Sequence, residues 1–261
     1  MFRAERPINA ALAATFLVKT NTMPESQTSH CIQLWLSPPS TCSYLPAETE
    51  QVGVIFDEQW LTPAGYSQLL TAGFRRNGQS LYRPHCPACS ACKSLRISTL
   101  QFSPSRSQKR AMKYWSAASW RIYDKLPPEF FALYARYISA RHAGGSMYPP
   151  DKAQFESFAE CQWLDVAYLC MYLEDRLVAV AVTDVLPDAL SACYTFFDPD
   201  LSAHSPGVAM LMKQLEWAKQ SGKRWVYPGY QVDACRAMSY KKRFRPAQEL
   251  TQTGWQWVNE C

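Results

Sequence analysis

The chain has 261 residues, 48% of them hydrophobic, which is enough for one large domain or two packed subdomains. No apolar run approaches the roughly 20 residues of a membrane-spanning helix, so the sequence predicts a soluble protein. The formal net charge of +5 is regional: between Glu58 and Asp124 there are ten Lys or Arg residues and no acid, while elsewhere acidic residues outnumber basic ones by 22 to 17. Such a local excess of positive charge predicts a polyanionic partner.

The N-terminal segment has some features of a secretory leader. Arg3 and Arg6 precede an apolar, Ala-rich stretch at 8–18, yet no small-residue cleavage site follows it. We therefore expect Met23 to be the natural start and residues 1–30 to form a disordered N-terminal extension. A cytoplasmic location follows from the same interpretation.

Three cysteines are notable for their spacing. Cys86, Cys89 and Cys92 follow one another at three-residue intervals within the basic window. Each Cys-x-x-Cys step folds into a tight knuckle that turns both sulfurs inward, so the three can present thiolates to one zinc ion or iron–sulfur cluster. Cys42 and His85 are candidates for the fourth ligand. The same spacing also fits a redox-active or purely structural thiol cluster, and the sequence leaves these alternatives open.

The elements expected in the first half of the chain are short strands and one helix. Thr62 can cap a helix that Pro63 begins, since proline fits the first helical turn. Asn77-Gly78 lies between two short segments and is a strong signal for a β-hairpin. In chain order we expect strands at 31–36 and 51–56, a helix at 62–73, a hairpin around 77–78 and a strand at 95–97.

A second helix is expected to begin at Ser103-Pro104 by the same pattern of a cap followed by proline. Four basic residues fall at helical spacing along it: Arg106, Lys109, Arg110 and Lys113. A solvated helix face normally mixes acids with bases, and no acid occurs here. We therefore interpret this face as a contact for tRNA or another nucleic acid rather than as a merely solvated surface.

Helices and strands alternate from about residue 120 onward. We expect helices at 127–145, 151–161 and 205–221, and strands at 166–173, 177–186, 190–197 and 225–227. This order resembles the N-acetyltransferase superfamily, in which the third and fourth strands splay apart and the acyl donor enters the gap. The loop at 204–209 keeps only one glycine of that superfamily's pyrophosphate-binding pattern, which argues against coenzyme A as the donor.

Six motifs are spread over the chain between residues 31 and 250. They are Thr41-Cys42-Ser43-Tyr44-Leu45-Pro46, Gly73-Phe74-Arg75-Arg76, Tyr82-Arg83-Pro84 with the cysteine triplet and Leu95-Arg96-Ile97, Ser103-Pro104-Ser105-Arg106-Ser107-Gln108, Tyr194-Thr195-Phe196-Phe197-Asp198-Pro199-Asp200, and Met238-Ser239-Tyr240-Lys241 continuing to Phe244-Arg245-Pro246. Together they resemble the arginyl-tRNA–protein transferase family, and within it the bacterial branch of aspartate/glutamate leucyltransferases. Residues 1–22 have no counterpart in that resemblance, which supports Met23 as the start.

The resemblance implies an activity and an architecture. The activity is transfer of leucine from Leu-tRNA to the N-terminal amine of proteins that begin with Asp or Glu, which marks them for degradation by the N-degron pathway. The architecture is α+β, with a smaller Cys-containing, basic α+β subdomain at 31–120 and an N-acetyltransferase-like (GNAT) aminoacyltransferase domain at 121–261. We expect a monomer that needs no cofactor for the transfer, with zinc or an iron–sulfur cluster at Cys42, Cys86, Cys89 and Cys92 as an additional hypothesis.

Three alternatives remain at this point. Arginyl transfer from Arg-tRNA would use the same chemistry, because nothing in the residues separates a leucine pocket from an arginine pocket. A coenzyme A acetyltransferase would share the C-terminal half but has no use for the acid-free basic window. A non-catalytic, redox-sensing RNA-binding module would use the cysteines and the basic helix alone.

Candidate site residues follow from the proposed chemistry. Transfer needs a hydrogen-bond donor for the tetrahedral oxyanion, and the strand-end tyrosines are candidates, with ordinary packing as the competing interpretation. Asp198 could anchor the incoming ammonium or accept its proton. The acidic side chain of the acceptor calls for guanidinium or ammonium groups. The catalytic candidates are thus Tyr194, Asp198, Tyr227 and Tyr230, and the acceptor-binding candidates are Arg76, Arg96 and Lys241.

Overall fold

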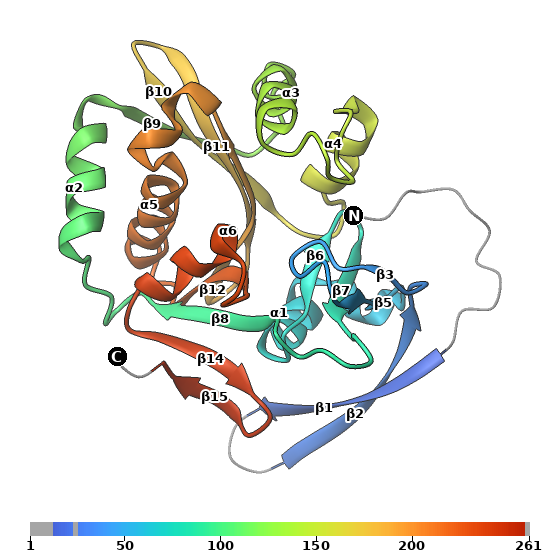
Figure 1. Ribbon diagram of the computed structural model, residues 1–261. Helices are drawn as coiled ribbons and strands as arrows, with labels where there is room; N and C mark the ends of the chain where they lie inside the picture. The colour runs from blue at the N-terminus through green and yellow to red at the C-terminus, as the bar shows by residue number, and fades with distance from the viewer. Residues whose placement is uncertain (1–12, 23–25, 259–261) are drawn as a thin grey trace.

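The computed structural model describes residues 13–22 and 26–258, and its fold is α+β, as the sequence predicts (Figure 1). The described strands form sheets of five, eight and two strands. The five-stranded sheet has the order β1 (Ala13–Thr22), β2 (Ser26–Leu36), β5 (Val52–Ile55), β7 (Ser80–Pro84) and β6 (Arg75–Asn77). The two-stranded sheet pairs β3 (Ser40–Thr41) with β4 (Thr49–Glu50).

The eight-stranded sheet is the largest unit of the described structure. Its order is β15 (Gly254–Trp257), β14 (Ala247–Thr251), β8 (Lys93–Ser98), β13 (Trp225–Gln231), β12 (Ala189–Phe197), β11 (Arg176–Val185), β10 (Val166–Leu173) and β9 (Ser119–Tyr123). Strand β8 comes from the segment expected to form the N-terminal subdomain, yet it pairs with β13 and β14. The first and second halves of the chain therefore share this sheet.

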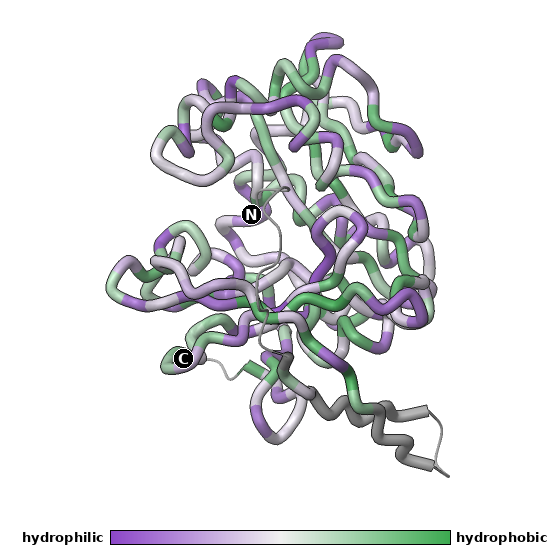
Figure 2. Tube along the Cα trace, turned by 90° about the vertical axis from the view of Figure 1, so that its right-hand side faces the viewer, coloured by the Kyte–Doolittle hydropathy of each residue, from purple (hydrophilic) through white to green (hydrophobic). Residues whose placement is uncertain are grey.

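Helices cover both faces of the large sheet. Helices α2 (Arg106–Tyr114) and α5 (Pro206–Gln220) pack on one face, and α3 (Phe130–Arg141) and α4 (Lys152–Ala159) on the other (Figure 1). The alternation along β11 explains the two layers, because Val180 and Val182 contact α3 and α4 while Ala179 and Ala181 contact α5. Unlike β11, which is apolar on both faces, many segments mix hydrophobic and hydrophilic residues, as expected for elements buried on one side (Figure 2).

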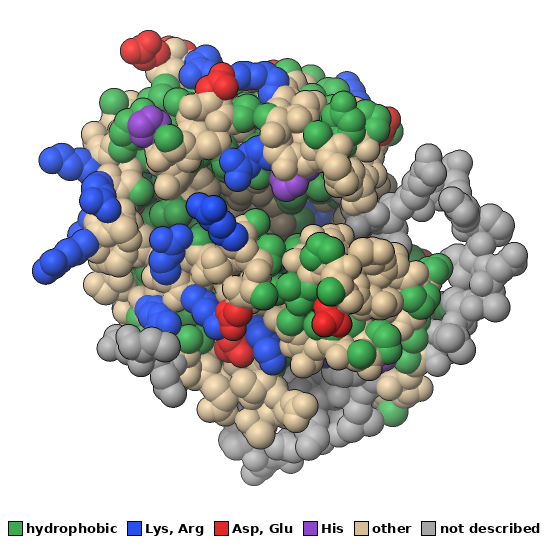
Figure 3. Space-filling model, viewed as in Figure 1, with side chains coloured by type: hydrophobic (Ala, Val, Ile, Leu, Met, Phe, Trp, Pro, Cys, Tyr) green, Lys and Arg blue, Asp and Glu red, His purple; other side chains and the backbone are tan. Residues whose placement is uncertain are grey.

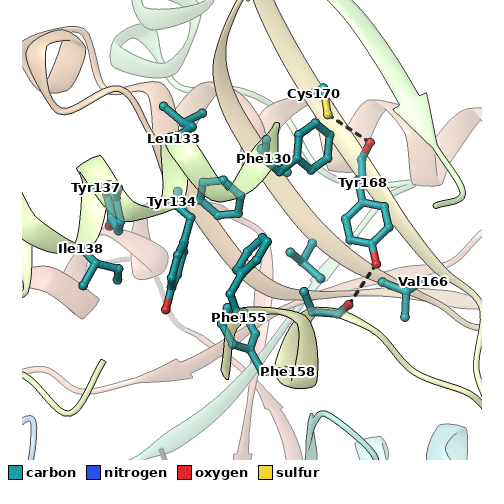
Figure 4. Close-up of a cluster of buried hydrophobic side chains, with 14 of the residues drawn as sticks. Phe130, Leu133, Tyr134, Tyr137, Ile138, Phe155, Phe158, Val166, Tyr168 and Cys170 are labelled. Carbon is teal, nitrogen blue, oxygen red and sulfur yellow. Dashed lines mark hydrogen bonds between the residues drawn. The ribbon is translucent and has the colours of Figure 1, made fainter. Parts of the chain in front are cut away.

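Aromatic side chains fill the layer beneath α3 and α4 (Figure 4). Tyr134 of α3 meets Phe155 and Phe158 of α4 above the central strands, and Phe130 packs against Tyr168 of β10. The Tyr168 hydroxyl on β10 donates a hydrogen bond to the Ala159 carbonyl at 3.2 Å, which ties the end of α4 to the sheet. This packing fixes the two helices relative to the strands that border the candidate site.

Local signals explain where the first helices begin. Helix α1 (Pro63–Thr71) starts as predicted, with the Thr62 hydroxyl accepting the Gly65 N–H at 3.1 Å. Helix α2 begins at Arg106, slightly later than the sequence suggested, because Ser105 and Gln108 form a reciprocal capping box. The remaining short helices are α6 (Arg236–Ser239) and the 3₁₀ turns η1 (Glu58–Trp60), η2 (Trp115–Ala117), η3 (Pro199–His204) and η4 (Tyr240–Arg243).

The predicted hairpins and the parallel crossover are confirmed. Residues Asn77 and Ser80 close the β6–β7 hairpin, and β10 pairs antiparallel with β11 across the turn at 174–175. Helix α5 connects β12 to β13, which are parallel. Their pairing covers only Ala189–Ser191 against Trp225–Tyr227, so the two strands part immediately afterwards.

The N-terminal segment differs from its prediction. Residues 13–22 form β1 and pair antiparallel with 26–35 of β2, so ordered strands occupy much of the segment expected to be a disordered extension. A long two-stranded arm is not visible to a search for helical or apolar periodicity, because its pairing depends on the register between the two strands. Residues 1–12 and 23–25, which include Met23, lie outside the described residues. No helix within the described ranges is long and apolar enough to cross a bilayer.

Candidate active site

The face of the molecule seen in Figure 3 is hollowed near its centre. The hollow lies between α3 and α4 on one side and α6 with the small strands β3 to β6 on the other, and Lys and Arg side chains gather along one edge of it. Within the large sheet, the pairing of β12 with β13 ends after Ser191 and Tyr227.

Arg75 bridges the point where β12 and β13 part. Its guanidinium donates one hydrogen bond to the Ala192 carbonyl on β12 at 2.7 Å and another to the Tyr227 carbonyl on β13 at 3.3 Å. The side chain comes from β6 in the five-stranded sheet and is only 5% exposed. Arg75 thus satisfies carbonyls that the interrupted ladder leaves unpaired.

Lys241 lies beside Arg75. Its ammonium donates to the Tyr230 carbonyl at 2.6 Å, and it is only 8% exposed. A Cβ added to Gly229 would lie 3.4 Å from Lys241 Nζ and 3.8 Å from Arg75 NH2, so both cations lie against the same glycine. Gly229 has φ +92°, in the region that favours glycine. Burial, reinforced by the charge of Arg75, lowers the pKa of Lys241 to about 7, while the thiols of Cys235 and Cys92 act in the opposite direction.

Tyr82 lies near Arg75, whereas Tyr194 belongs to the aromatic layer beneath α3 and α4. Burial raises the pKa of Tyr82 to about 12, although the charge of Arg75 opposes this shift. Tyr194 on β12 lies among Tyr137, Tyr134 and Tyr44, and burial together with these phenols raises its pKa above its usual value. The Tyr194 hydroxyl, which donates to Met147 Sδ at 3.5 Å, therefore stays protonated and can act as a hydrogen-bond donor.

The other two candidate tyrosines have different surroundings. The Tyr230 hydroxyl donates to the Gly73 carbonyl at 2.7 Å in a fully buried position. Tyr227 packs edge-on against Trp255, and burial raises its pKa while Arg96 opposes that shift. Both tyrosines thus have partners within the protein, whereas Tyr194 packs with the aromatic side chains of α3 and α4.

Asp198 is held by basic residues at the end of β12. Arg136 and Arg176 both form ion pairs with its carboxylate, which is 1% exposed and also accepts the Asp200 N–H at 3.2 Å. Burial would raise its pKa, but the hydrogen bond from Arg176 and these other partners lower the pKa below the usual value. Asp198 caps η3, as expected for turn formation, and the structure does not bring it to the Arg75–Lys241 pair.

Arg76 is the centre of a buried network rather than an open binding group. It contacts Asp184 at 2.7 Å, and neither side chain is exposed. Its remaining donors meet the carbonyls of Gly78, Phe158 and Glu160 at 3.0 to 3.2 Å. The structure therefore uses the guanidinium to join β6, β11 and α4, and gives it no free donor toward the hollow.

Arg96 is also engaged within the protein. Its guanidinium lies 4.1 Å from the ring centroid of Trp225 and 4.3 Å from that of Trp255, and Nε donates to Gln248 Oε1 at 2.7 Å. These contacts tie β8 to β13, β14 and β15. Of the three acceptor-binding candidates, only Lys241 lies at the gap between β12 and β13.

The basic helix has the arrangement that the sequence predicts. Arg106, Lys109, Arg110 and Lys113 of α2 are all exposed, and none forms an ion pair with a described residue (Figure 3). Tyr114 is 48% exposed and stacks on His204 with ring centroids 3.7 Å apart. The neighbouring aromatic ring, Trp115, is in the core, as the packing interpretation predicts.

The thiols of Cys42, Cys86, Cys89 and Cys92 lie near one another. Burial, followed by the neighbouring thiols of Cys86, Cys42 and Cys89, raises the pKa of Cys92 to about 12. Cys42 Sγ accepts the N–H groups of Tyr44 and Leu45 at 3.4 Å. However, no three or more His, Cys, Asp or Glu side chains in the described part of the chain are arranged to hold a metal ion. As placed, the thiols form a cluster but not a ligand set.

The sequence pointed to Arg76 but not to its neighbour Arg75, which contacts both β12 and β13 where they part. The two residues are adjacent on β6, so their side chains point to opposite faces. Only the packing of β6 shows that one arginine meets Asp184 and the other meets the gap. The positive charge between Phe74 and Asn77 was the available signal, but it does not distinguish the two positions.

The chain is similar to known proteins along most of its length. Residues 40–110 match the N-terminal model and residues 129–251 the C-terminal model of the arginine-tRNA-protein transferases. The aspartate/glutamate leucyltransferase of Aeromonas salmonicida is 48% identical over 224 residues, which cover 86% of this chain and 94% of that protein. Those of Vibrio cholerae and Shewanella oneidensis are 47% and 45% identical, over 86% and 88% of this chain and 96% of each relative.

A solved structure of L-PGS from Bacillus licheniformis is also similar, with a TM-score of 0.41 and 10% identity over 65% of this chain and 50% of that one. That likeness is too low to support an inference about fold or function. The two family models together span most of the described chain, and the relatives align along nearly their whole length. This chain belongs to the arginine-tRNA-protein transferase family.

Proposed function

We propose that this protein transfers leucine from Leu-tRNA to the N-terminal amine of proteins that begin with Asp or Glu. The observation that carries this proposal is the 48% identity, along almost the entire chain, to a relative named aspartate/glutamate leucyltransferase. The product would carry an N-terminal leucine and enter degradation by the N-degron pathway. The protein would act as a cytoplasmic monomer.

The donor would bind as in an N-acetyltransferase-like fold. Support comes from the antiparallel strands β10 to β12, the crossover through α5 and the parallel strand β13, whose pairing with β12 ends after three residue pairs. The aminoacyl ester would enter the gap that opens there. The domains at 31–120 and 121–261 would then both contribute, because Arg75 reaches the gap from the N-terminal part.

The chemistry requires little beyond positioning. The ester linking leucine to the tRNA is already activated, and the attacking α-amine has a pKa of about 7.7 to 8.0. Holding amine and ester carbonyl together supplies much of the rate, and a hydrogen-bond donor stabilises the tetrahedral oxyanion. We expect Tyr194 to supply this donor, since burial keeps its hydroxyl protonated and its described acceptor is the weak one of Met147 Sδ.

A metal is not needed for any of these steps. The thiols near Cys92 are not arranged as a ligand set, so no step is assigned to a metal or cluster there. Zinc or an iron–sulfur cluster at Cys42, Cys86, Cys89 and Cys92 would have a structural or regulatory role. Its influence on the site would pass through Cys92, whose thiol is close enough to affect the pKa of Lys241.

Reversing charge on α2 tests the tRNA contact. We expect the double variant Lys109→Glu/Arg110→Glu to weaken Leu-tRNA binding and to lower the slope of log affinity against log salt by about 2, because each lost phosphate contact removes about one unit. Filter binding or fluorescence anisotropy at several salt concentrations gives both values.

The matched control is Lys152→Glu/Lys219→Glu, which makes the same change in net charge at two exposed positions on α4 and α5. This control should keep the salt slope of the unmodified protein. Equal slopes for all three proteins would mean that α2 is a solvated surface without a role in RNA binding.

The activity itself is tested with radiolabelled Leu-tRNA and a peptide that begins with Asp. Label on the peptide that is lost when the donor is treated first with RNase supports the proposed transfer. Acetyl transfer from acetyl-CoA without RNA would instead indicate an ordinary acetyltransferase.

A further inference from the structure

Arg75 and Lys241 form a buried pair of cations without a carboxylate partner. Neither residue makes an ion pair with any Asp or Glu that the structure describes, although they are only 5% and 8% exposed. The neighbouring Arg76 is different, since its buried guanidinium forms an ion pair with Asp184 at 2.7 Å. Against the effect of burial, Asp184, which pairs with Arg76, raises the pKa of Arg75 from beyond ion-pair distance, but neither cation of the pair has a carboxylate in contact. Burying two charges side by side in this way is costly, so the pair favours a bound anion between them.

The pair also has hydrogen-bond donors to offer. Arg75 uses two of its five N–H groups on the carbonyls of Ala192 and Tyr227, and Lys241 donates to the carbonyl of Tyr230 and weakly to Met238 Sδ at 3.5 Å. Because Gly229 has no side chain, nothing from β13 separates the two cationic groups on that side. A planar guanidinium beside an ammonium matches the two oxygens of a carboxylate.

The position of the pair relates it to the reaction. The two carbonyls bound by Arg75 mark the place where β12 and β13 part, which is where the leucyl ester would enter. An acceptor whose side chain is held there has its own α-amine only a few bonds away. The amine would therefore lie close to the ester carbonyl.

Building on the leucyl transfer proposed above, we infer that Arg75 and Lys241 together bind the side-chain carboxylate of the acceptor's N-terminal Asp or Glu. They select acidic N-termini by supplying the counter-charge, and they orient the amine toward the gap. Arg75 is a specificity residue that neither the sequence nor the family resemblance pointed out. Arg76 and Arg96 have structural roles in place of the acceptor contact that the sequence suggested for them.

An RNA phosphate is the competing anion, and the burial of the site argues against it. The exposed bases of α2 suit a phosphate backbone, which remains largely solvated. Arg75 and Lys241 are more than nine-tenths buried, and Tyr82 and Tyr230 pack edge-on next to Arg75 with ring centroids 6.2 Å apart. A site of this depth suits a single small side chain.

The test compares peptides that begin with Asp and with Asn, which have nearly the same size but differ in charge. For Lys241→Met, we expect kcat/KM for the Asp peptide relative to the Asn peptide to fall at least tenfold, with the KM for Leu-tRNA unchanged. Arg75→Met should act in the same direction, and Lys241→Arg, which keeps the charge, should retain most of the discrimination. The matched control is Lys242→Met, because Lys242 is adjacent on η4 but pairs with Asp233.

The possible outcomes are distinguishable. An increase in the KM for Leu-tRNA with unchanged Asp-over-Asn discrimination would show that the pair binds RNA, and would overturn the inference. Equal loss in Lys242→Met would point to disturbance of η4 rather than to lost recognition, and would also overturn it. Absence of leucine transfer by the unmodified protein would contradict the proposed function itself, whereas transfer without acid preference in that protein would contradict only the role of the pair. Thermal unfolding of each variant identifies any that is not folded. If Lys241→Met is not folded, the Asp-over-Asn ratio of Lys241→Arg is compared with that of the unmodified protein instead.

Discussion

Replacing Asp184 by Asn is expected to lower the free energy of unfolding by about 3 to 5 kcal/mol, because it leaves the Arg76 guanidinium buried without a counter-charge. Asp184 and Arg76 are completely buried, and Tyr66 and Ser191 donate to the second carboxylate oxygen at 3.1 Å. The network joins the five-stranded sheet to β11 and β12. Urea unfolding followed by tryptophan fluorescence measures the change.

Arg121→Ala is the control, since its ion pair with Asp175 is largely exposed and its loss should change the free energy of unfolding little. The double variant Asp184→Leu/Arg76→Met should be more stable than Asp184→Asn, because it removes both buried charges. A loss below about 1 kcal/mol in Asp184→Asn would show that the network does not hold the two sheets together.

The preference for acidic acceptors is expected to weaken as pH rises through about 7. Burial and Arg75 lower the pKa of Lys241 to about 7, so the ammonium is charged below that pH and becomes neutral above it. An acceptor Asp side chain, with a usual pKa near 3.9, stays ionised throughout. The ratio of kcat/KM for Asp to Asn peptides should therefore fall by up to roughly tenfold per pH unit above 7, until the charge of Arg75 alone remains.

Both peptides have the same kind of α-amine, so the effect of its titration on kcat/KM cancels in the ratio. Lys241→Met should give a low ratio that varies little with pH. Of the groups near Lys241, Arg75 stays charged in this range, and the Cys92 thiol stays neutral because burial raises its pKa to about 12. A ratio that rises from pH 6 to pH 8 in the unmodified protein would contradict a charged Lys241 in acceptor binding.

Much of the fold could be predicted from local signals. The Thr62 cap, the Asn77-Gly78 hairpin and the apolar strands β10 and β11 each depend on residues close together in the sequence. The parallel arrangement of β12 and β13 followed from the helix between them. By contrast, β1 was missed, and so was the addition of β8 to the large sheet, because both depend on pairing with distant strands.

The candidate site was harder to predict for a related reason. Sequence alone identifies which residues carry charge, but not which of those charges meet a partner. Arg76, Arg96 and Asp198 are residue types that the chemistry could use, yet each already has partners within the protein. Arg76 pairs with Asp184, Arg96 lies against two tryptophan rings, and Asp198 pairs with two arginines. Arg75 and Lys241 are 166 positions apart in the chain and converge only when β6 and η4 meet over Gly229. Their role depends on tertiary packing, which no local pattern encodes.

The central claim is leucyl transfer from tRNA to an acidic N-terminus. The most direct measurement incubates the protein with an Asp-starting peptide and, in parallel reactions, radiolabelled Leu-tRNA, radiolabelled Arg-tRNA or labelled acetyl-CoA, followed by mass analysis of the peptide. We predict one added leucine on the α-amine from Leu-tRNA alone, abolished by prior RNase treatment of the donor. Addition of arginine in place of leucine, or of an acetyl group without RNA, would contradict the account.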